Sequence, residues 1–508
     1  MADLDLLVLG SGVAGLSAAV RAAELHGMRV GVLTKGELHQ ATTRWAQGGV
    51  AAVLGGDPDS TDLHLADTLG AGAGLCDGDA VRVLVDEGPA RVHELIALGA
   101  AFDRDQDGTL QLAREGGHSL PRIVHAGGAA TGAEIERTLV EAVSASVKAV
   151  HESTFALDLI VEGGECRGVV AGSIDGPIEV RAANVLVATG GYGQLFAVTT
   201  NPAEATGDGV AMALRAGVAV ADIEFEQFHP TALHHPAMPR PLLSEALRGH
   251  GALLRDAKGD RFVDEMLSRD KVSRGMVTRM LEQRVEHLWL DATHLQHFAE
   301  RFPTIMAALA EANLDPATDW LPVAPAAHYS CGGVLADLDG ATSLPGLWVA
   351  GETSCNGVMG ANRLASNSLL DGMVFGPRVV EAIDRGIRGA SPTGAMRSLL
   401  GGGEIGGTLL STPPEAAWAA TDRESLQRLM TVNAGVLRSA ESLTIAAEAC
   451  RGSVIGDDPA AWELRNLLTV GRALCAAALA RSESRGAHTR TDFPELADHQ
   501  QSRFIFGG

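Results

Sequence analysis

The residues most suggestive of chemistry stand near the start of the chain, where three glycines follow a short apolar run. The run covers residues 4–9 and leads into the motif Gly10-Ser11-Gly12-Val13-Ala14-Gly15. In such a motif the first glycine allows a tight turn, the second lets the backbone approach a pyrophosphate, and the third lets a helix pack against a strand. Helical periodicity over 14–26 and a second apolar run at Val30–Leu33 complete a βαβ unit. The spacing therefore predicts a dinucleotide site.

The motif alone leaves the identity of the dinucleotide open. An acid that binds the ribose is expected about 20 residues further on, near the end of the second strand. That place reads Thr34-Lys35 here, and Glu37 lies slightly beyond it. NAD and FAD both remain possible at this point, and a purely structural glycine turn is the competing interpretation.

The surrounding pattern predicts how the chain positions this site. Apolar runs that end in Thr189-Gly190-Gly191 and in Gly351-Glu352 indicate two further strands before glycine turns, far apart in the sequence. We therefore expect one nucleotide-binding domain assembled from residues 1–222 and 331–395, with 223–330 inserted as a capping domain. The predicted strands beyond the first two cover 156–161, 169–171, 184–188 and 346–350.

The last fifth of the chain has a different composition. Residues 396–417 are rich in Gly, Pro and Ser, which is typical of a linker. After it, 422–443 and 462–480 have helical periodicity, so 418–508 is predicted to be a helical bundle. The expected class is thus α/β: a Rossmann-like domain, an inserted α+β capping domain and a C-terminal helical domain.

Composition excludes several classes of function. The chain has 63 acidic against 40 basic residues and a formal charge of −23, which argues against binding nucleic acid. No basic leader or apolar run of membrane length is present, so we expect no membrane partner and a cytoplasmic location. The six cysteines are scattered, and the adjacent His234-His235 lack metal-ligand spacing. We predict reduced thiols and no metal.

A set of later motifs resembles the succinate dehydrogenase/fumarate reductase flavoprotein family. The resemblance runs in order along nearly the whole chain, through Thr42–Gly49, Thr206–Met212, Phe228–Thr231, Gly360–Leu369, Glu483–His488 and Arg490–Pro494. It implies FAD as the dinucleotide. It also implies a set of residues that hold FAD: Gly10, Ser11, Gly12, Val13, Ala14, Gly15, Lys35, Thr42, Thr43, Arg44, Trp45, Ala46, Gln47, Gly48, Gly49, Phe155, Ala156, Asp208, Glu352, Ser368 and Leu369.

Within that family the chain is similar to members that oxidise L-aspartate. Membrane-bound succinate dehydrogenases carry a flavin-linking His five residues before the Gln of their Ala-Gln-Gly-Gly loop. Here that position is Thr42, so FAD is expected to be noncovalent, and His39 is out of register. The segments Arg114–Ser119 and Pro325–Gly333 resemble those of the L-aspartate-oxidising members. The first of them contains Glu115, which implies an anion for a substrate amino group.

The resemblance also implies roles for polar side chains. Arg363 and Arg269 would bind the substrate carboxylates as bidentate, permanently charged donors, and Arg269 would also handle a proton. The alternative for both is an ordinary ion pair at the protein surface. Arg248 is a candidate structural partner. His229 and His328 would donate hydrogen bonds to carboxylate oxygens, although a buried histidine with satisfied bonds is the usual case. Ser244 could bind a carboxylate or cap a helix.

The implied reaction is FAD-dependent oxidation of L-aspartate to iminoaspartate by hydride transfer, with electrons passed to oxygen or fumarate. It would be the first step of NAD biosynthesis through quinolinate, with possible coupling to quinolinate synthase. The active site would lie between the capping and cofactor domains and close by a hinge motion. One rival is a succinate- or fumarate-specific flavoprotein docked on an iron–sulfur partner. Another is a flavin-binding redox sensor without turnover.

Overall fold

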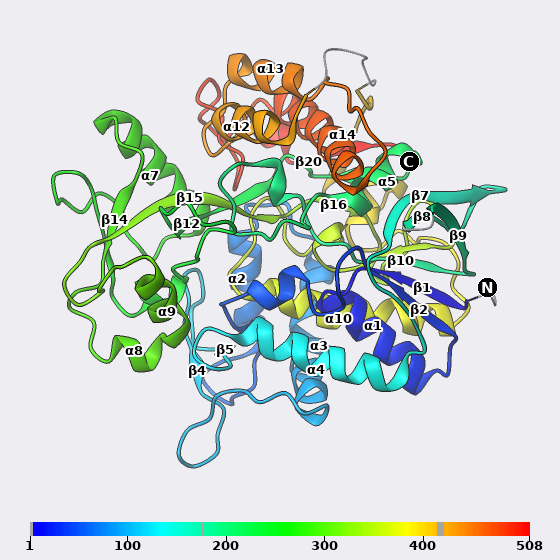
Figure 1. Cartoon of the computed structure of the whole chain (residues 1–508), viewed down its shortest axis with the longest axis horizontal. Coiled ribbons are helices and arrows are strands. Elements are labelled where there is room, and N and C mark those ends of the chain that lie inside the picture. Colours follow the sequence, from blue (N-terminus) through cyan, green and yellow to red (C-terminus); the bar gives the residue numbers. More distant parts are fainter. Residues whose placement is uncertain (1–3, 174–175, 414–420) are drawn as a thin grey trace.

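Three parts of the molecule can be distinguished in Figure 1: a central α/β part, a lobe on the left and a mostly helical part at the top. The computed structural model describes residues 4–173, 176–413 and 421–508. It confirms the predicted α/β class with a separate lobe and a C-terminal helical region.

The central part is built on a parallel sheet in the order β17-β10-β1-β2-β6. Four of its strands are apolar and fully buried, which is why they read as continuous hydrophobic runs. β17, which comes last in sequence among these five strands, pairs with β10. Two distant stretches of chain therefore build one sheet, as predicted. The strands are β1 (Leu6–Leu9), β2 (Val30–Leu33), β6 (Ala149–His151), β10 (Val185–Val187) and β17 (Leu347–Val349).

Two helices of the central part, α1 and α10, pack closely beside the sheet (Figure 1). A Cβ on Gly372 or Gly376 of α10 would approach Val13 and Ala14 of α1, so these glycines allow the contact. The helical prediction for 14–26 is confirmed by α1 and the wider helical turn Arg21–Leu25 that continues it. The helices are α1 (Val13–Val20), α2 (Thr61–Ala71), α3 (Gly78–Ala97), α4 (Thr131–Ser146), α5 (Asp208–Arg215) and α10 (Asn367–Asp384).

Two small antiparallel sheets complete this part. One lies at the right of Figure 1 and includes the strands predicted at 156–161 and 169–171. The other follows the order β3-β5-β4. Their strands are β7 (Phe155–Glu162), β8 (Glu165–Ser173) and β9 (Gly176–Arg181), and β3 (Val50–Ala51), β4 (Leu112–Ala113) and β5 (Ile123–Val124).

The lobe has a four-stranded antiparallel sheet in the order β12-β15-β14-β13 and a core of its own, which includes Leu254, Val272 and Ile305. Its two longest strands run back toward the central part (Figure 1). All its elements fall inside the predicted capping segment 223–330. They are β12 (Glu226–Leu233), β13 (Leu253–Arg255), β14 (Leu288–Asp291), β15 (Leu321–Ser330), α6 (Glu245–Gly249), α7 (Arg269–Gln283), α8 (Phe298–Arg301) and α9 (Pro303–Glu311).

The C-terminal part contains α12 (Arg423–Asn433), α13 (Ala440–Ala449) and α14 (Pro459–Ala480). The periodic stretch 422–443 is therefore two helices, because Ser439 caps a new one with a reciprocal capping box. A buried ion pair from Arg481 to Glu224 fastens this part to the start of the lobe, and Glu483 of the same part also pairs with Arg481.

The predicted linker, 396–417, differs from expectation, although its last four residues lie outside the described residues. It contains α11 (Arg397–Leu400) and β19 (Gly406–Leu410). That strand pairs with β20 (Ser502–Phe506), so the C-terminus is not wholly helical. A glycine-rich strand gains order from a partner about 100 residues away, which local composition does not reveal. The same sheet includes β11 (Val220–Ala221), β16 (Gly333–Leu335) and β18 (Ser354–Cys355).

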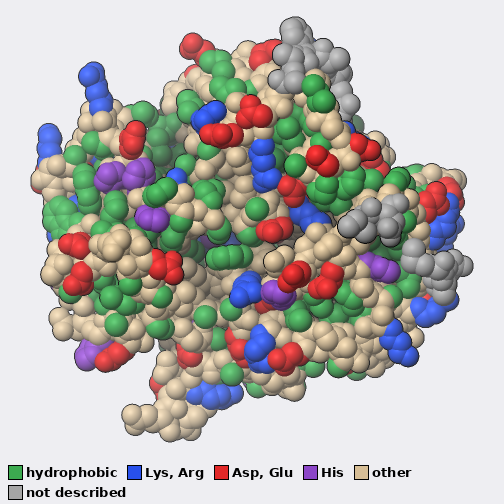
Figure 2. Space-filling view, in the orientation of Figure 1, with side chains coloured by type: hydrophobic (Ala, Val, Ile, Leu, Met, Phe, Trp, Pro, Cys, Tyr) green, Lys and Arg blue, Asp and Glu red, His purple; other side chains and the backbone are tan. Residues whose placement is uncertain are grey.

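Charge is spread over the surface. Figure 2 shows Asp and Glu side chains distributed among hydrophobic and basic ones on this face. Among the described residues, no helix is both long enough and apolar enough to cross a membrane.

Candidate active site

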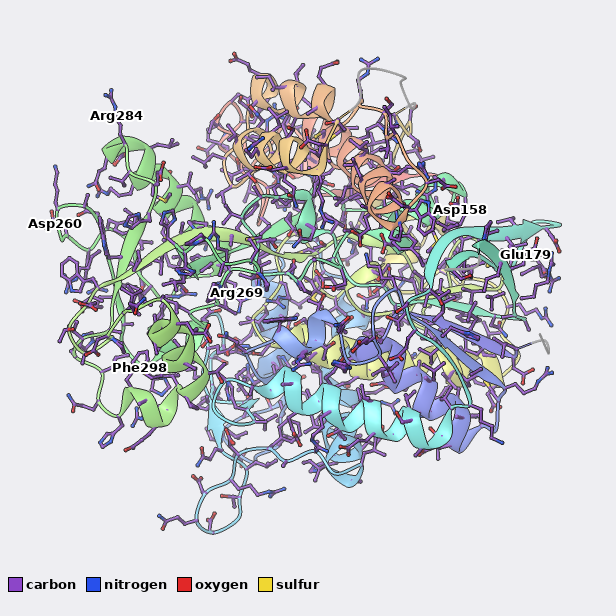
Figure 3. All side chains as sticks on the ribbon, in the orientation of Figure 1. Asp158, Glu179, Asp260, Arg269, Arg284 and Phe298 are labelled. Atoms are coloured by element: carbon purple, nitrogen blue, oxygen red, sulfur yellow. The ribbon has the colours of Figure 1, made fainter. Side chains whose placement is uncertain are left out.

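A cavity of about 640 Å³ is bordered by both the central part and the lobe. Its wall includes the glycine turn at one end and side chains of β12, α6, α7 and β15 at the other. Figure 3 shows Arg269 at the inner edge of the lobe, on the side of the central part. A cavity of this size with a few polar groups is typical of a cofactor or substrate site.

The glycine turn suits the close approach of a phosphate. Gly10 has a φ of +104°, and a Cβ there would overlap the carbonyl oxygen of Ala188. Gly12 and Ala14 line the cavity at the N-terminus of α1, where backbone N–H groups favour anions. Gly15 lies behind the wall, where a Cβ would strike the Gly10 carbonyl oxygen. Its role is therefore to pack helix against strand.

An ion cluster stands beside this turn. The Lys35 ammonium donates to Glu463 and lies 2.9 Å from a carboxylate oxygen of Asp208. The field of the two carboxylates outweighs burial and raises the pKa of Lys35. Asp208 also accepts from Asn466. Two groups of α14, Glu463 and Asn466, thus fix the cofactor end of the cavity, a contribution that no sequence motif predicted.

The loop Thr42–Gly49 forms the next part of the wall. Its first four residues make a short 3-10 helix, and Thr43 Oγ1 accepts a hydrogen bond from the Val13 N–H at 2.9 Å. A Cβ on Gly132 of α4 would overlap the Thr43 carbonyl, and one on Gly49 would overlap the Val124 carbonyl. Both glycines therefore let the loop lie flat against its support.

The N-terminus of α10 also faces the cavity. Ser366 has a φ of +61° and turns the chain into the helix, and Ser368 and Leu369 line the wall. The partial positive charge of a helix N-terminus favours electron density that accumulates nearby. Glu352 accepts from the Ser330 N–H, and burial raises its pKa to about 7.

Two residues assigned to FAD are not in the wall: Gly15, described above, and Phe155. Phe155 lies behind it, with its ring 5.2 Å from the Lys35 ammonium and 5.5 Å from Trp462. Its neighbour Ala156 does line the cavity. Alternation along β7 explains the difference, since successive side chains point to opposite faces.

At the other end of the cavity two guanidinium groups come together. Arg363 is buried and stacks 4.3 Å from the Tyr329 ring centre, and its Nε has no hydrogen-bond partner among the residues that the structure describes. Burial and the nearby Arg269 lower the pKa of Arg363 to about 10. The group stays cationic at neutral pH, and an anion would relieve the mutual repulsion.

Arg269 is held by two side chains. Its Nε donates to Glu245 at 2.7 Å, and a terminal nitrogen donates to Gln227 at 3.1 Å. The other Glu245 oxygen lies 3.1 Å from a nitrogen of Arg248, which makes Arg248 an ion-pair partner behind the wall. Glu245 and Gln227 were not predicted as site residues. Each lies within two residues of a predicted site residue, and this closeness in sequence was the signal that could have identified them.

Two histidines present neutral donors. His229 Nδ1 accepts the Thr231 N–H at 3.2 Å, and its buried Nε2 has no hydrogen-bond partner in the described part of the chain. Burial and nearby arginines hold the pKa of His229 well below its usual range. The ring therefore carries its proton on Nε2. His328 lines the same wall, with Nδ1 2.7 Å from Thr200 Oγ1 and the ring centres 5.1 Å apart.

Ser244 is at the N-cap position of α6, but its side chain makes no capping hydrogen bond there. It is buried and borders the cavity beside Glu245. The hydroxyl is thus available to a ligand, and the capping alternative gains no support.

Glu115 brings a negative charge into the same cavity. One carboxylate oxygen accepts from Ser366 at 2.6 Å, and the other lies 3.7 Å from His125 Nε2. Although burial raises the pKa of Glu115, His125, Ser366 and the field of Arg269 together lower it to about 2. An ionised carboxylate thus lines the same cavity as two arginines.

The chain matches known proteins over nearly all its length. Residues 5–369 match the FAD binding domain family, and residues 458–504 match the fumarate reductase flavoprotein C-terminal family. The L-aspartate oxidase of Streptomyces coelicolor is 47% identical over 99% of this chain and 90% of that protein. The chain belongs to the L-aspartate oxidase family.

Further members of the L-aspartate oxidase family and related structures agree. The enzyme of Mycobacterium bovis is 42% identical over 99% of this chain and 95% of its own length. The E. coli quinol fumarate reductase FrdA structure superposes with a TM-score of 0.85 at 29% identity, covering 98% of this chain and 93% of that chain. The predicted family and FAD as the cofactor are thereby confirmed.

The described residues fit FAD. The glycine turn and the Thr42–Gly49 loop form a close-fitting cradle, and the wall at Thr42 carries no imidazole that could link covalently to a flavin. His39 is half exposed, lies 3.3 Å from Glu37 and is outside the wall. These residue types favour noncovalent binding.

Proposed function

We propose that this protein oxidises L-aspartate to iminoaspartate with FAD and passes the electrons to oxygen or fumarate. The observation that carries the proposal is the ionised Glu115 in a cavity that also contains Arg269 and Arg363. A simple diacid needs only cations. An amino diacid needs cations for its carboxylates and an anion for its amino group.

In the proposed binding mode each substrate group meets its chemical complement. Arg363 and Arg269 hold the two carboxylates through charge-assisted hydrogen bonds, and His229 and His328 donate neutral ones. Ser244 adds a hydroxyl. Glu115 receives the amino group. Three attachment points fix the orientation of the Cα–H bond, which is the part of catalysis that the protein itself supplies.

When bound, FAD supplies the isoalloxazine ring that accepts a hydride. The loop Thr42–Gly49 and the N-terminus of α10 hold that ring in place in our proposal, and the lobe covers the substrate. Substrate-binding groups come from both parts: His229, Ser244, Arg269 and His328 from the capping segment, Glu115 and Arg363 from the cofactor domain. A hinge between them would admit substrate and then exclude water.

We propose that the reaction is the first step of NAD biosynthesis through quinolinate, in which a condensing enzyme would consume iminoaspartate. Functional coupling to quinolinate synthase is part of the proposal and rests on pathway logic. All six cysteines are free thiols, which is consistent with our proposal of a reducing, cytoplasmic setting.

Steady-state turnover tests the proposal. The purified FAD-loaded protein is given L-aspartate or succinate in air, and peroxide and substrate loss are measured. We expect peroxide with L-aspartate and little with succinate. Consumption of succinate without peroxide from L-aspartate would instead favour a succinate- or fumarate-specific flavoprotein.

A further inference from the structure

We propose that His125 takes up the proton that the substrate ammonium group must lose, and that it receives this proton through Glu115. The inference rests on the proposed function. L-Aspartate is an ammonium ion at neutral pH, and its nitrogen needs a free electron pair before the C=N bond can form. Glu115 can hold the ammonium group, but a second group must carry the proton away.

The geometry places the imidazole directly behind the carboxylate. Glu115 is almost completely buried and lines the cavity, whereas His125 is not in the wall. His125 Nε2 lies 3.7 Å from one Glu115 oxygen, and Ser366 occupies the other oxygen. The His125 side chain is 12% exposed against 1% for Glu115, so the imidazole has contact with solvent that the carboxylate lacks.

Three segments surround the ring. β5 ends immediately before it, and the loop ahead of β3 brings Gly49, where a Cβ would stand 3.1 Å from Nε2. Asp103 contributes its backbone N–H to the His125 carbonyl oxygen. Among the described residues, the carboxylate recorded within ion-pair distance of this ring is that of Glu115. Arg269 acts on the pair from across the cavity through Glu115.

Other basic groups of the wall are poor proton acceptors. Burial and nearby arginines hold the pKa of His229 and that of His328 well below their usual range. Arg269 already donates to Glu245 and Gln227, and a guanidinium group has no acceptor atom. His125, by contrast, lies 3.7 Å from Glu115 and its side chain is partly exposed, and a neutral imidazole has a nitrogen that can accept a proton.

The step balances without any redox change. An N–H bond of the ammonium group breaks and an O–H bond forms on Glu115. That bond then breaks as an N–H bond forms on His125, which becomes imidazolium and releases the proton to water. The substrate nitrogen keeps the electron pair that forms the imine. His125 acts through Glu115 and is therefore a positioning and proton-transfer residue.

The pH profile of the His125→Gln holoenzyme tests the proposal, because Gln can still donate to Glu115 but cannot accept a proton. We expect kcat/KM for L-aspartate to fall about 10²-fold at neutral pH. The deficit should shrink as the pH rises towards the range in which free L-aspartate loses its own ammonium proton. His39→Gln, an exposed change of the same type, should leave the profile unaltered.

Succinate binding, followed by perturbation of the flavin spectrum, supplies a readout that does not involve an amino group. We expect the same Kd for succinate in wild type and His125→Gln. A profile like that of the wild type, or a deficit equal at every pH, would overturn the proposal. Should His125→Gln fail to retain FAD, the same measurements apply to His125→Asn. A wild type inactive on L-aspartate would overturn the proposed function itself, which separates the two failures.

Discussion

At the scale of single residues, the main feature of this protein is a cavity lined by side chains of opposite charge. Arg363 and Glu115 were predicted because their sequence motifs resembled those of a known family. Glu245, Gln227 and His125 were not, although each has a direct contact with a predicted residue. Sequence motifs identify groups that meet ligands, while the partners behind them become visible only when distant segments are folded together.

Removing the charge of Glu115 should separate amino-acid from diacid chemistry. We expect Glu115→Gln to lower kcat/KM for L-aspartate 10- to 100-fold, since a charge-assisted hydrogen bond contributes about 1.5–3 kcal/mol. Succinate should bind at least as tightly as to the wild type. Steady-state kinetics and flavin difference spectra measure both quantities. Glu37→Gln, an exposed change, is the control, and an unchanged kcat/KM in Glu115→Gln would contradict the assignment.

Arg363 should be required for binding any dicarboxylate. We expect Arg363→Leu to weaken both L-aspartate and succinate by at least 10²-fold, because the carboxylate would lose a buried cationic partner. Titrations of the flavin spectrum give both Kd values. Arg284→Leu removes the same charge at the outer end of the lobe (Figure 3) and should change neither. Intact flavin bleaching by L-aspartate in Arg363→Leu would show that the site is misplaced.

Helices and strands could be predicted where the sequence pattern that produces them is local. The strands β1, β2, β10 and β17 are short buried apolar runs before glycine turns, and the sequence located all four. β19 and β20 escaped prediction because their hydrogen bonds come from strands far away in the sequence: β19 pairs with β20, and β20 pairs also with β11. The break between α12 and α13 lies in a capping box whose second member is Ser rather than Glu or Gln, which weakens the usual signal.

The close packing of the Thr42–Gly49 loop against the backbone beneath it leads to a prediction at the scale of elements. Gly49→Ala should weaken FAD binding at least 10-fold, because the new methyl would overlap the Val124 carbonyl and push the loop into the cavity. FAD content after gel filtration and the Kd for added FAD measure the effect. Gly56→Ala, where nothing lies within 4 Å of the new methyl, is the matched control. Equal FAD affinity in both variants would exclude this role for Gly49.

At the scale of the whole molecule, the C-terminal part is tied to the cofactor end of the cavity. Glu463 and Asn466 of α14 contact Lys35 and Asp208, while Arg481 reaches Glu224 at the start of the lobe. These contacts join residues more than 200 positions apart, which no local pattern predicts. The helical part therefore belongs to the cofactor site rather than standing apart from it.

Glu226 is buried where the three parts meet, and it should make the stability of the folded protein depend on pH. Burial and neighbouring Glu352 raise the pKa of Glu226 to about 8. A carboxyl with a raised pKa in the folded state loses its stability contribution as pH rises from its unfolded value, near 4.5, through 8. Glu226→Gln should therefore gain stability relative to wild type across that window, by up to about 1.4 kcal/mol per pH unit.

Urea unfolding of the holoprotein at pH 5 and pH 8 measures this gain. The stability difference between Glu226→Gln and wild type should be small at the lower pH and a few kcal/mol at the higher. Glu441→Gln, an exposed change on α13, should produce no such trend. A difference independent of pH would mean that Glu226 is ionised in the folded protein.

The central claim is that Glu115 and the arginines of this cavity select L-aspartate as the reductant of FAD. The visible spectrum of the purified protein, recorded anaerobically before and after L-aspartate, tests it most directly. We predict that the oxidised flavin bands bleach with L-aspartate and persist with an equal concentration of succinate. Bands that persist with L-aspartate and bleach with succinate would contradict the account.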